Sequence, residues 1–167
     1  MFQVEFVQID YTGVTSPKEK RMREHECAYS LLDKMLKEAG IGEYEIIKGQ
    51  NGKPYLKNSK IHFNLSHTEG FCVVCISDLE IGVDCEKIDL DFAPKIVGFS
   101  KRYFLENELC ILENSDYSPD VFFEIWTKKE AYIKKHALNA GALSKIDTTQ
   151  ETYECMRVGE YIISILK

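Results

Sequence analysis

The chain has no hydrophobic run that approaches the roughly 18 residues needed to cross a bilayer. Its first segment, MFQVEFVQIDY, carries Glu5 and Asp10 in an alternating apolar pattern and lacks a basic leader. We therefore expect neither a signal peptide nor a membrane anchor, and a cytoplasmic protein. Only 4 prolines and 10 glycines occur in 167 residues, so no linker or low-complexity segment is evident and one domain is expected.

An excess of basic charge is also missing. The formal net charge is −6 at pH 7, whereas a general nucleic-acid binder carries a basic balance that neutralises phosphates. Nucleic acid is therefore not an expected partner, and an anionic ligand would have to meet a local basic patch. The 44% hydrophobic and 29% charged residues describe an ordinary globular protein and identify no function by themselves.

The six cysteines are scattered and form no disulfide framework. Cys72 and Cys75 make a CxxC, but they lie in the apolar, strand-like run FCVVCI, where positions i and i+3 point to opposite faces. No second pair completes a zinc site. We interpret these cysteines as core residues of a protein from a reducing compartment.

The first half of the chain predicts a strand, a helix and further strands. Ser16 and Pro17 are an N-cap and a first helical residue, apolar residues recur at helical spacing to Ala39, and Gly40 ends the helix. Asn51 and Gly52 favour a chain reversal. Strands are predicted over residues 44–48, 61–66, 71–77 and 81–86, the last three as an antiparallel meander.

The second half is predicted to be mainly helical before a terminal hairpin. Residues 89–99 read as a looser region, and a helix is predicted over 101–113. Residues 115–119 interrupt it, and a long, mostly buried helix runs from Pro119 to about 139–141. Two strands, 153–158 and 161–166, are joined at Gly159-Glu160.

Two segments carry paired charged residues. Asp84 and Glu86 stand at i and i+2 of a predicted strand, so their carboxylates share a face, as in sites that recruit Mg²⁺ beside a phosphate. The alternative is a solvated strand face. Glu130 and Lys134 are at i and i+4 of the late helix, with Trp126 one turn earlier on the same side. Here the alternative is a surface salt bridge.

A third segment, Asn64-Leu65-Ser66-His67, closes a predicted strand. A serine hydroxyl, a histidine and free turn amides can bind phosphate oxygens there, although Ser66 could simply cap the turn. Because Ser66 and His67 are adjacent, they project to opposite sides of a strand, so a Ser-His hydrolase is not indicated.

Together, the order GKP, NLSH, IGVDCEK and WTKKEAYIK resembles the surfactin-type 4′-phosphopantetheinyl transferases. The resemblance covers about residues 52–141. It implies that Asp84, Glu86 and Glu130 bind Mg²⁺, with Mn²⁺ as an alternative, beside the pyrophosphate of coenzyme A. It also implies that Glu130, directly or through a metal-bound water, takes a proton from a carrier-protein serine, and that Lys134 assists the departing 3′,5′-ADP.

The resemblance also suggests the residues that bind coenzyme A. Ser66 and His67, helped by Lys53, would hold its phosphates, and Lys129 would contact phosphate as well. The family usually has a cationic residue in the first helix where this chain has Tyr29. Basic residues on the early part of that helix could substitute for it, namely Lys20, Arg21 and Arg23.

The fold that the resemblance implies is α+β, with two similar α/antiparallel-β halves, about 1–80 and 81–167, and the site between them. The N-terminal half is shortened relative to the larger family members, and a monomer is expected. The expected function is transfer of 4′-phosphopantetheine from coenzyme A to a serine of an apo acyl or peptidyl carrier protein. The alternative is a catalytically silent module of the same fold that binds coenzyme A or the carrier.

Overall fold

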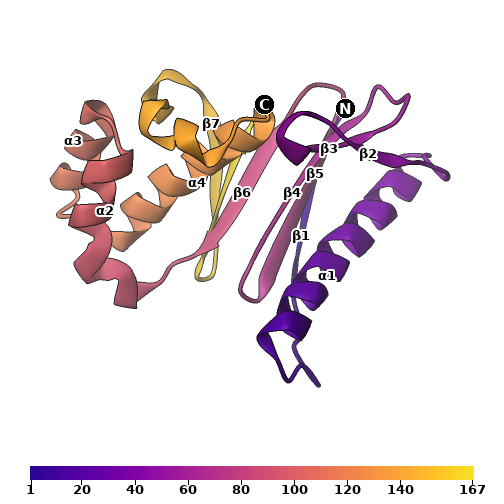
Figure 1. Cartoon of the computed structure of the whole chain (residues 1–167), viewed down its shortest axis with the longest axis horizontal. Helices are drawn as coiled ribbons and strands as arrows, with labels where there is room; N and C mark the ends of the chain where they lie inside the picture. The colour runs from indigo at the N-terminus through magenta and orange to yellow at the C-terminus, as the bar shows by residue number, and fades with distance from the viewer.

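The computed structural model describes all residues, Met1–Lys167. Strands occupy the middle of the molecule, with helix α1 on one side and helices α2, α3 and α4 on the other (Figure 1). The two termini lie near each other at the same end. None of the helices combines the length and apolar character that spanning a membrane requires.

The first half of the chain contains one long helix and five strands. Its elements are β1 (Phe2–Gln8), α1 (Pro17–Glu38), β2 (Ile46–Lys48), β3 (Pro54–Leu56), β4 (His62–Thr68) and β5 (Phe71–Ser77).

The second half contains three helices and three strands, connected in part by short 3₁₀ turns. Its elements are β6 (Gly82–Lys87), α2 (Ile96–Tyr103), α3 (Glu106–Asn114), α4 (Pro119–Lys135), β7 (Tyr153–Val158) and β8 (Tyr161–Leu166).

The two halves repeat one sheet topology. The strand orders are β1-β5-β4 and β6-β8-β7, and every pairing is antiparallel. In each sheet the first strand of the half pairs with the last, which in turn pairs with the strand before it. The predicted α+β fold is confirmed, and a helix follows the first strand in both halves.

The predicted meander is wrong in its third strand. Both edges of β5 are already occupied, by β1 and by β4, so β6 cannot pair with it. Instead β6 joins the second sheet and runs alongside β4, where the Val83 amide donates a hydrogen bond of 2.9 Å to Asn64 Oδ1. This placement makes β4 and β6 the junction between the two halves.

The helix predicted over 101–113 is broken in the structure. Phe104 adopts an extended backbone between α2 and α3, and its buried ring stacks on Phe122 with centroids 5.4 Å apart. Glu108 then caps the new helix, because its Oε2 accepts a hydrogen bond of 2.8 Å from the Leu105 amide. Helix α2 also begins earlier than predicted, at Ile96.

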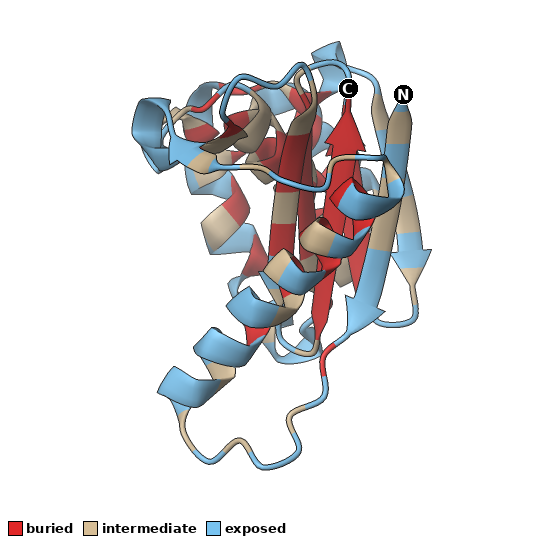
Figure 2. Cartoon of the chain, turned by 90° about the vertical axis from the view of Figure 1, so that its right-hand side faces the viewer, coloured by how far each residue is buried: buried red, intermediate tan, exposed pale blue.

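Helix α1 begins and ends as its sequence predicts. Ser16 Oγ accepts a hydrogen bond from the Glu19 amide, and the Glu19 carboxylate accepts one from the Ser16 amide, which completes a capping box. Gly40 has a φ of +83° just beyond the last turn. Figure 2 shows the outer surface of this helix exposed and the strands behind it buried.

Separate apolar clusters fill the two faces of β5. Cys72 belongs to the cluster under α1, and Cys75 belongs to the cluster shared by β5, β6 and β8. The prediction that these cysteines are core residues on opposite faces is therefore confirmed. A third cluster packs α2, α3 and α4 together around Phe122.

Gly82 allows α4 to pack closely on β6. A Cβ added there would lie 2.7 Å from the Lys135 amide nitrogen and closer still to the Ala131 carbonyl oxygen. We expect Gly82→Ala to lower the free energy of unfolding by about 1 to 3 kcal/mol, because both clashing atoms are helix backbone. Denaturant unfolding measures the change.

Gly98→Ala is the matched control, since nothing lies within 4 Å of a Cβ at that position in α2. It should be neutral or stabilise by up to about 1 kcal/mol. Equal destabilisation by both substitutions would contradict the close approach at Gly82.

Candidate active site

Three segments far apart in the sequence meet where β4, β6 and α4 come together. Ser66 Oγ donates a hydrogen bond of 2.8 Å to Asp84 Oδ1. Lys134 Nζ lies 2.7 Å from Ser66 Oγ and 2.7 Å from the same Asp84 oxygen. The structure thus brings together residues from the NLSH, VDCE and WTKKEAYIK segments.

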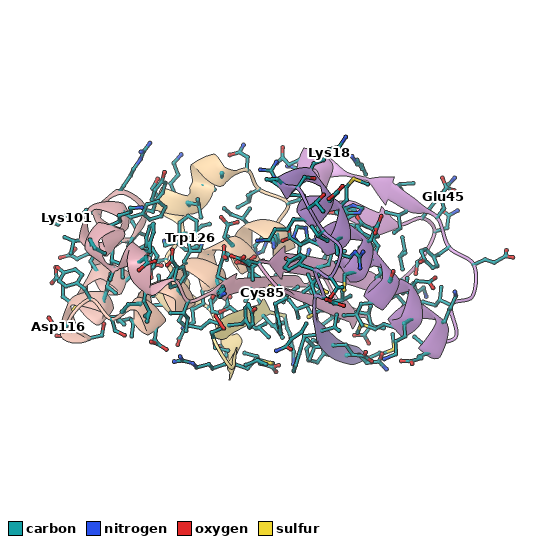
Figure 3. The ribbon with its side chains drawn as sticks, turned by 90° about the horizontal axis from the view of Figure 1, so that it is seen from below. Lys18, Glu45, Cys85, Lys101, Asp116 and Trp126 are labelled. Carbon is teal, nitrogen blue, oxygen red and sulfur yellow. The ribbon has the colours of Figure 1, made fainter.

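The parallel course of β4 and β6 explains this arrangement. Side chains two apart on a strand share a face, so Ser66 and Thr68 face Asp84 and Glu86 in the same order. Thr68 Oγ1 donates to Glu86 Oε2 at 3.1 Å. Cys85, between the two acids, points to the opposite face and is buried in the core near the middle of the molecule (Figure 3).

The carboxylates of the site are poorly compensated. Asp84 is buried, and its Oδ2 atom has no hydrogen-bond partner. Burial and the neighbouring charge of Asp84 raise the pKa of Glu86 to about 7. The same two causes raise the pKa of Glu130. A cation would relieve these unfavourable charges.

Lys134 supplies the one ammonium that bonds these acids directly. Burial alone would disfavour its charge, but the charge of Asp84 and the hydrogen bond to it outweigh burial and raise the pKa of Lys134. Lys134 is therefore protonated at neutral pH. One ammonium for Asp84, Glu86 and Glu130 leaves a net negative site.

The donor set of this site fits a hard divalent cation. No group of three or more His, Cys, Asp and Glu side chains is gathered closely enough to enclose a metal ion on its own. The unpartnered oxygen of Asp84 and the raised pKa of Glu86 nevertheless point to missing positive charge. Oxygen ligands of this kind suit Mg²⁺, which keeps several waters or substrate oxygens in its shell.

His67 lies at the edge of the same site, near the first half of α1. Its imidazole is 34% exposed, and Nδ1 lies 3.7 Å from Glu24 Oε2. Burial lowers the pKa of His67, although the charge of Glu24 opposes this shift. Arg21 and Arg23 are exposed on α1. Lys20 forms an ion pair of 2.6 Å with Glu69.

Lys53 is buried in the contact between the two halves. Its Nζ lies 2.6 Å from Glu80 Oε2 and donates to the Lys135 carbonyl at 2.7 Å, at the end of α4. Beside it, a cavity of about 220 Å³ is lined by residues 51–54 and by Lys134. In this structure, Lys53 therefore links the turn before β3 to the helix that carries Glu130 and Lys134.

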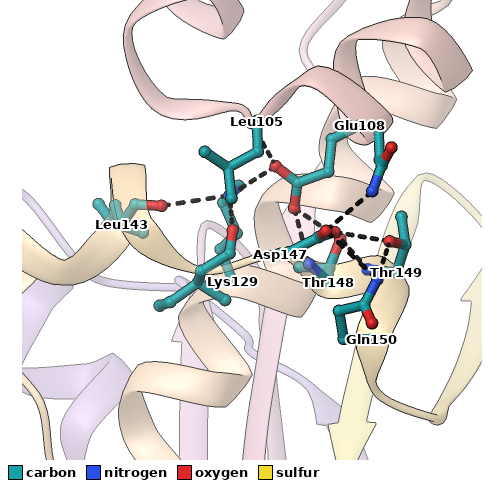
Figure 4. A network of polar contacts seen from close by, with 10 residues as sticks. Leu105, Glu108, Lys129, Leu143, Asp147, Thr148, Thr149 and Gln150 are labelled. Atoms are coloured by element: carbon teal, nitrogen blue, oxygen red, sulfur yellow. Dashed lines mark hydrogen bonds and ion pairs between the residues drawn. The ribbon is translucent and has the colours of Figure 1, made fainter.

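Lys129 does not face the site, which corrects the expectation that it contacts phosphate. It is fully buried on another face of α4, where its Nζ pairs with Glu108 at 2.6 Å (Figure 4). The carbonyls of Leu143 and Ile146 accept its other hydrogen bonds, at 3.1 and 2.5 Å. A buried ammonium with three partners has no donor left for a ligand.

Sequence reasoning missed Thr68 and the residues beneath His67. Thr68 could have been predicted from the alternation of side chains along a strand. If the strand continues to residue 68, the Thr68 hydroxyl lies on the same face as that of Ser66. Glu24 could not have been found in this way, since it looks like one more charge on an exposed helix. Its burial depends on how α1 packs.

A groove of about 500 Å³ adjoins the site at Thr68 and Glu86. It continues past Lys87 to the apolar side chains of Leu90, Phe92 and Phe123. Asp89 and Asp91 also line this far part, so apolar and acidic side chains occur together there. Such a groove can take an extended ligand with a polar head.

Comparison with known proteins identifies the family of the segment that carries most of this site. The family model of the 4′-phosphopantetheinyl transferase superfamily matches residues 80–157. The chain is 38% identical over 90 residues to 4′-phosphopantetheinyl transferase gsp of Aneurinibacillus migulanus, which covers 52% of the chain and 35% of the relative.

Two further relatives carry the same description. A 4′-phosphopantetheinyl transferase of Bacillus subtilis is 32% identical over 99 residues, covering 58% of the chain and 39% of the relative. AcpT of Escherichia coli O157:H7, also a 4′-phosphopantetheinyl transferase, is 30% identical over 107 residues, covering 63% and 55%. The chain thus spans between 35% and 55% of the length of these relatives.

These matches confirm the resemblance that the motifs predict. The chain is similar to the surfactin-type 4′-phosphopantetheinyl transferases, and residues 80–157 carry the match to the superfamily.

Glu86 should make the protein less stable as pH rises. Its carboxyl is more easily protonated in the folded state, with a pKa of about 7, than at the ordinary value of 4.5. The folded state therefore binds more protons between these values, and stability falls as pH increases through them. We expect Glu86→Gln to remove this fall, a difference on the order of 2 kcal/mol at neutral pH.

Urea unfolding across this pH range measures the effect. Glu106→Gln, at the exposed start of α3, is the control and should keep the wild-type pH dependence. If the unfolding free energies of wild type and Glu86→Gln change in parallel with pH, then burial and Asp84 do not raise the pKa of Glu86.

Removing one partner of the Lys129–Glu108 pair should be severe. Lys129→Met leaves the fully buried Glu108 carboxylate without its cation, so we expect a loss of about 3 to 5 kcal/mol in unfolding free energy. Lys128→Met is the control, because the Lys128–Glu124 pair is partly exposed and its loss should cost below about 1 kcal/mol. Similar losses for the two variants, measured by thermal or urea unfolding, would refute the buried pair.

Proposed function

We propose that this protein transfers the 4′-phosphopantetheine group of coenzyme A to a serine hydroxyl of an apo acyl or peptidyl carrier protein, releasing 3′,5′-ADP. The observation that carries the proposal is the convergence of Ser66, Asp84 and Lys134 beside Glu86. The relatives, all described as 4′-phosphopantetheinyl transferases, support the same chemistry.

The reaction is a phosphoryl transfer in which positioning and charge neutralisation dominate. The carrier serine oxygen forms a bond to the phosphorus of the phosphopantetheine group, and the bond from that phosphorus to the oxygen of 3′,5′-ADP breaks. The serine proton passes to a base. The site must therefore hold a pyrophosphate, accept a proton and stabilise the leaving phosphate.

Asp84, Glu86 and Glu130 are the residues that would hold Mg²⁺. When bound, the ion would neutralise charge on the pyrophosphate, which is its usual contribution to phosphoryl transfer. Ser66 and Lys134 fix one oxygen of Asp84 and leave the other without a partner. This leaves the free oxygen of Asp84 for the cation.

Glu130 and Lys134 are the proposed catalytic pair. Burial and Asp84 raise the pKa of Glu130, and a carboxylate that holds a proton more readily is a better general base. Lys134 is a protonated donor beside Asp84 and suits the charge that develops on the departing 3′,5′-ADP. Ser66 and His67 are proposed contacts for the phosphates of coenzyme A.

We also propose that Lys53 and the basic residues of α1 contact the phosphates of coenzyme A. Lys53 would have to release Glu80 to reach a phosphate. Arg21 and Arg23 are exposed, so a phosphate could reach their side chains without displacing a partly buried group. We further propose a cytoplasmic monomer whose partners are coenzyme A and the carrier, with pseudo-halves about 1–80 and 81–167.

Mass spectrometry of an apo carrier protein tests the function. After incubation with this protein, coenzyme A and Mg²⁺, the carrier should gain the mass of one phosphopantetheine group, and an EDTA control should gain none. Asp84→Asn and Glu130→Gln should each lower the rate at least about a hundredfold, since each removes a charge and little volume. Glu106→Gln, outside the site, should transfer at the wild-type rate.

A catalytically silent module that binds coenzyme A or the carrier is the second candidate. The matched region covers only 35% and 39% of the first two relatives. This partial coverage is the observation that favours a module without the full activity. Binding of coenzyme A without transfer to any of several carriers would support the module. Absence of transfer, together with absence of binding to both coenzyme A and the carriers, would reject both functions.

A further inference from the structure

A second polar network lies beneath His67. The Tyr11 hydroxyl, in the segment after β1, donates a hydrogen bond of 2.6 Å to Glu24 Oε1 on α1. The same hydroxyl accepts a hydrogen bond of 2.8 Å from the Gly70 amide, in the turn between β4 and β5. The network therefore ties α1 to the turn that follows His67.

The other oxygen of Glu24 faces His67. Its distance of 3.7 Å to Nδ1 is too long for a direct hydrogen bond but within range of a charge interaction. Glu24 is buried, and a buried glutamate is rarely left without a partner. His67 is the only basic side chain within 4 Å of its carboxylate.

We propose that Glu24, held in place by Tyr11, is a positioning residue that favours the doubly protonated form of the His67 imidazole and turns it toward a phosphate group of coenzyme A. A carboxylate beside Nδ1 holds a proton on that nitrogen, and in the doubly protonated imidazole Nε2–H can then donate to a phosphate oxygen. The proposal rests on the proposed function, because it takes phosphate as the ligand of His67.

Several charges act on this imidazole besides Glu24. Burial lowers the pKa of His67 most strongly, and the nearby charges of Lys134 and His25 also lower it. Glu24, and more weakly Asp84, raise it. Without Glu24, a larger share of the imidazole would be neutral at pH 7 and would bind an anion less well.

A purely architectural role for Glu24 makes a different prediction. In that case the carboxylate only anchors α1 through Tyr11, and its charge would repel an incoming phosphate. Glu24→Gln separates the two roles, because the amide oxygen can still accept the Tyr11 hydrogen bond while the charge is lost. The matched control is Glu26→Gln, on the exposed face of the same helix.

NMR titration of His67 in the full chain is the first readout, assigned with His67→Asn. Glu24→Gln should lower the His67 pKa by about one unit, and Glu26→Gln should not change it. Glu24→Asp, which retains the charge on a shorter side chain, should give an intermediate value. It also replaces Glu24→Gln if that variant does not fold.

Calorimetric binding of coenzyme A near neutral pH is the second readout. Glu24→Gln should weaken binding by up to about tenfold, because a smaller share of the His67 imidazole is then charged. An unchanged His67 pKa, or equal or tighter binding of coenzyme A by Glu24→Gln, would overturn the proposal. If the wild-type protein binds no coenzyme A, the proposed function fails. The NMR titration alone then decides whether Glu24 favours the protonated form of His67.

Discussion

Uncompensated negative charge at the junction of β4 and β6 is the constraint around which the two halves are arranged. Asp84 is buried there, and one of its oxygens is held by Ser66 from the first half and by Lys134 from α4. Buried charge is tolerated only when it is paired. The contact between the halves is therefore also the place where one buried carboxylate oxygen, Asp84 Oδ2, has no hydrogen-bond partner.

Helix α4 separates two uses of lysine that look alike in sequence. Lys129 and Lys134 both follow Trp126 in one amphipathic segment, yet Lys129 is fully buried against Glu108 and Lys134 faces Asp84. The first pair joins α3 to α4. The second belongs to the proposed active site, and its position depends on the close approach of α4 to β6 at Gly82.

The repeated sheet topology explains how the short first half still completes a site. Each half contributes one strand to the junction, β4 or β6, and the hydroxyls of β4 stand opposite the acids of β6. The match to the transferase superfamily covers residues 80–157 and so includes the acids and α4 but not β4. The first half packs on that segment and so adds Ser66, His67 and Thr68 to the candidate site.

The sequence by itself determined the local elements and the chemistry-bearing motifs. Capping at Ser16, the continuous apolar run of β5 and the terminal hairpin follow from short-range rules. Local geometry also places Asp84 with Glu86, and Glu130 with Lys134, on common faces. Only the tertiary structure decided the partner of β6, the break at Phe104 and the inward turn of Lys129. These three features depend on which strand edges are already paired and on which groups distant in sequence are buried together. Local sequence periodicity contains no information about either.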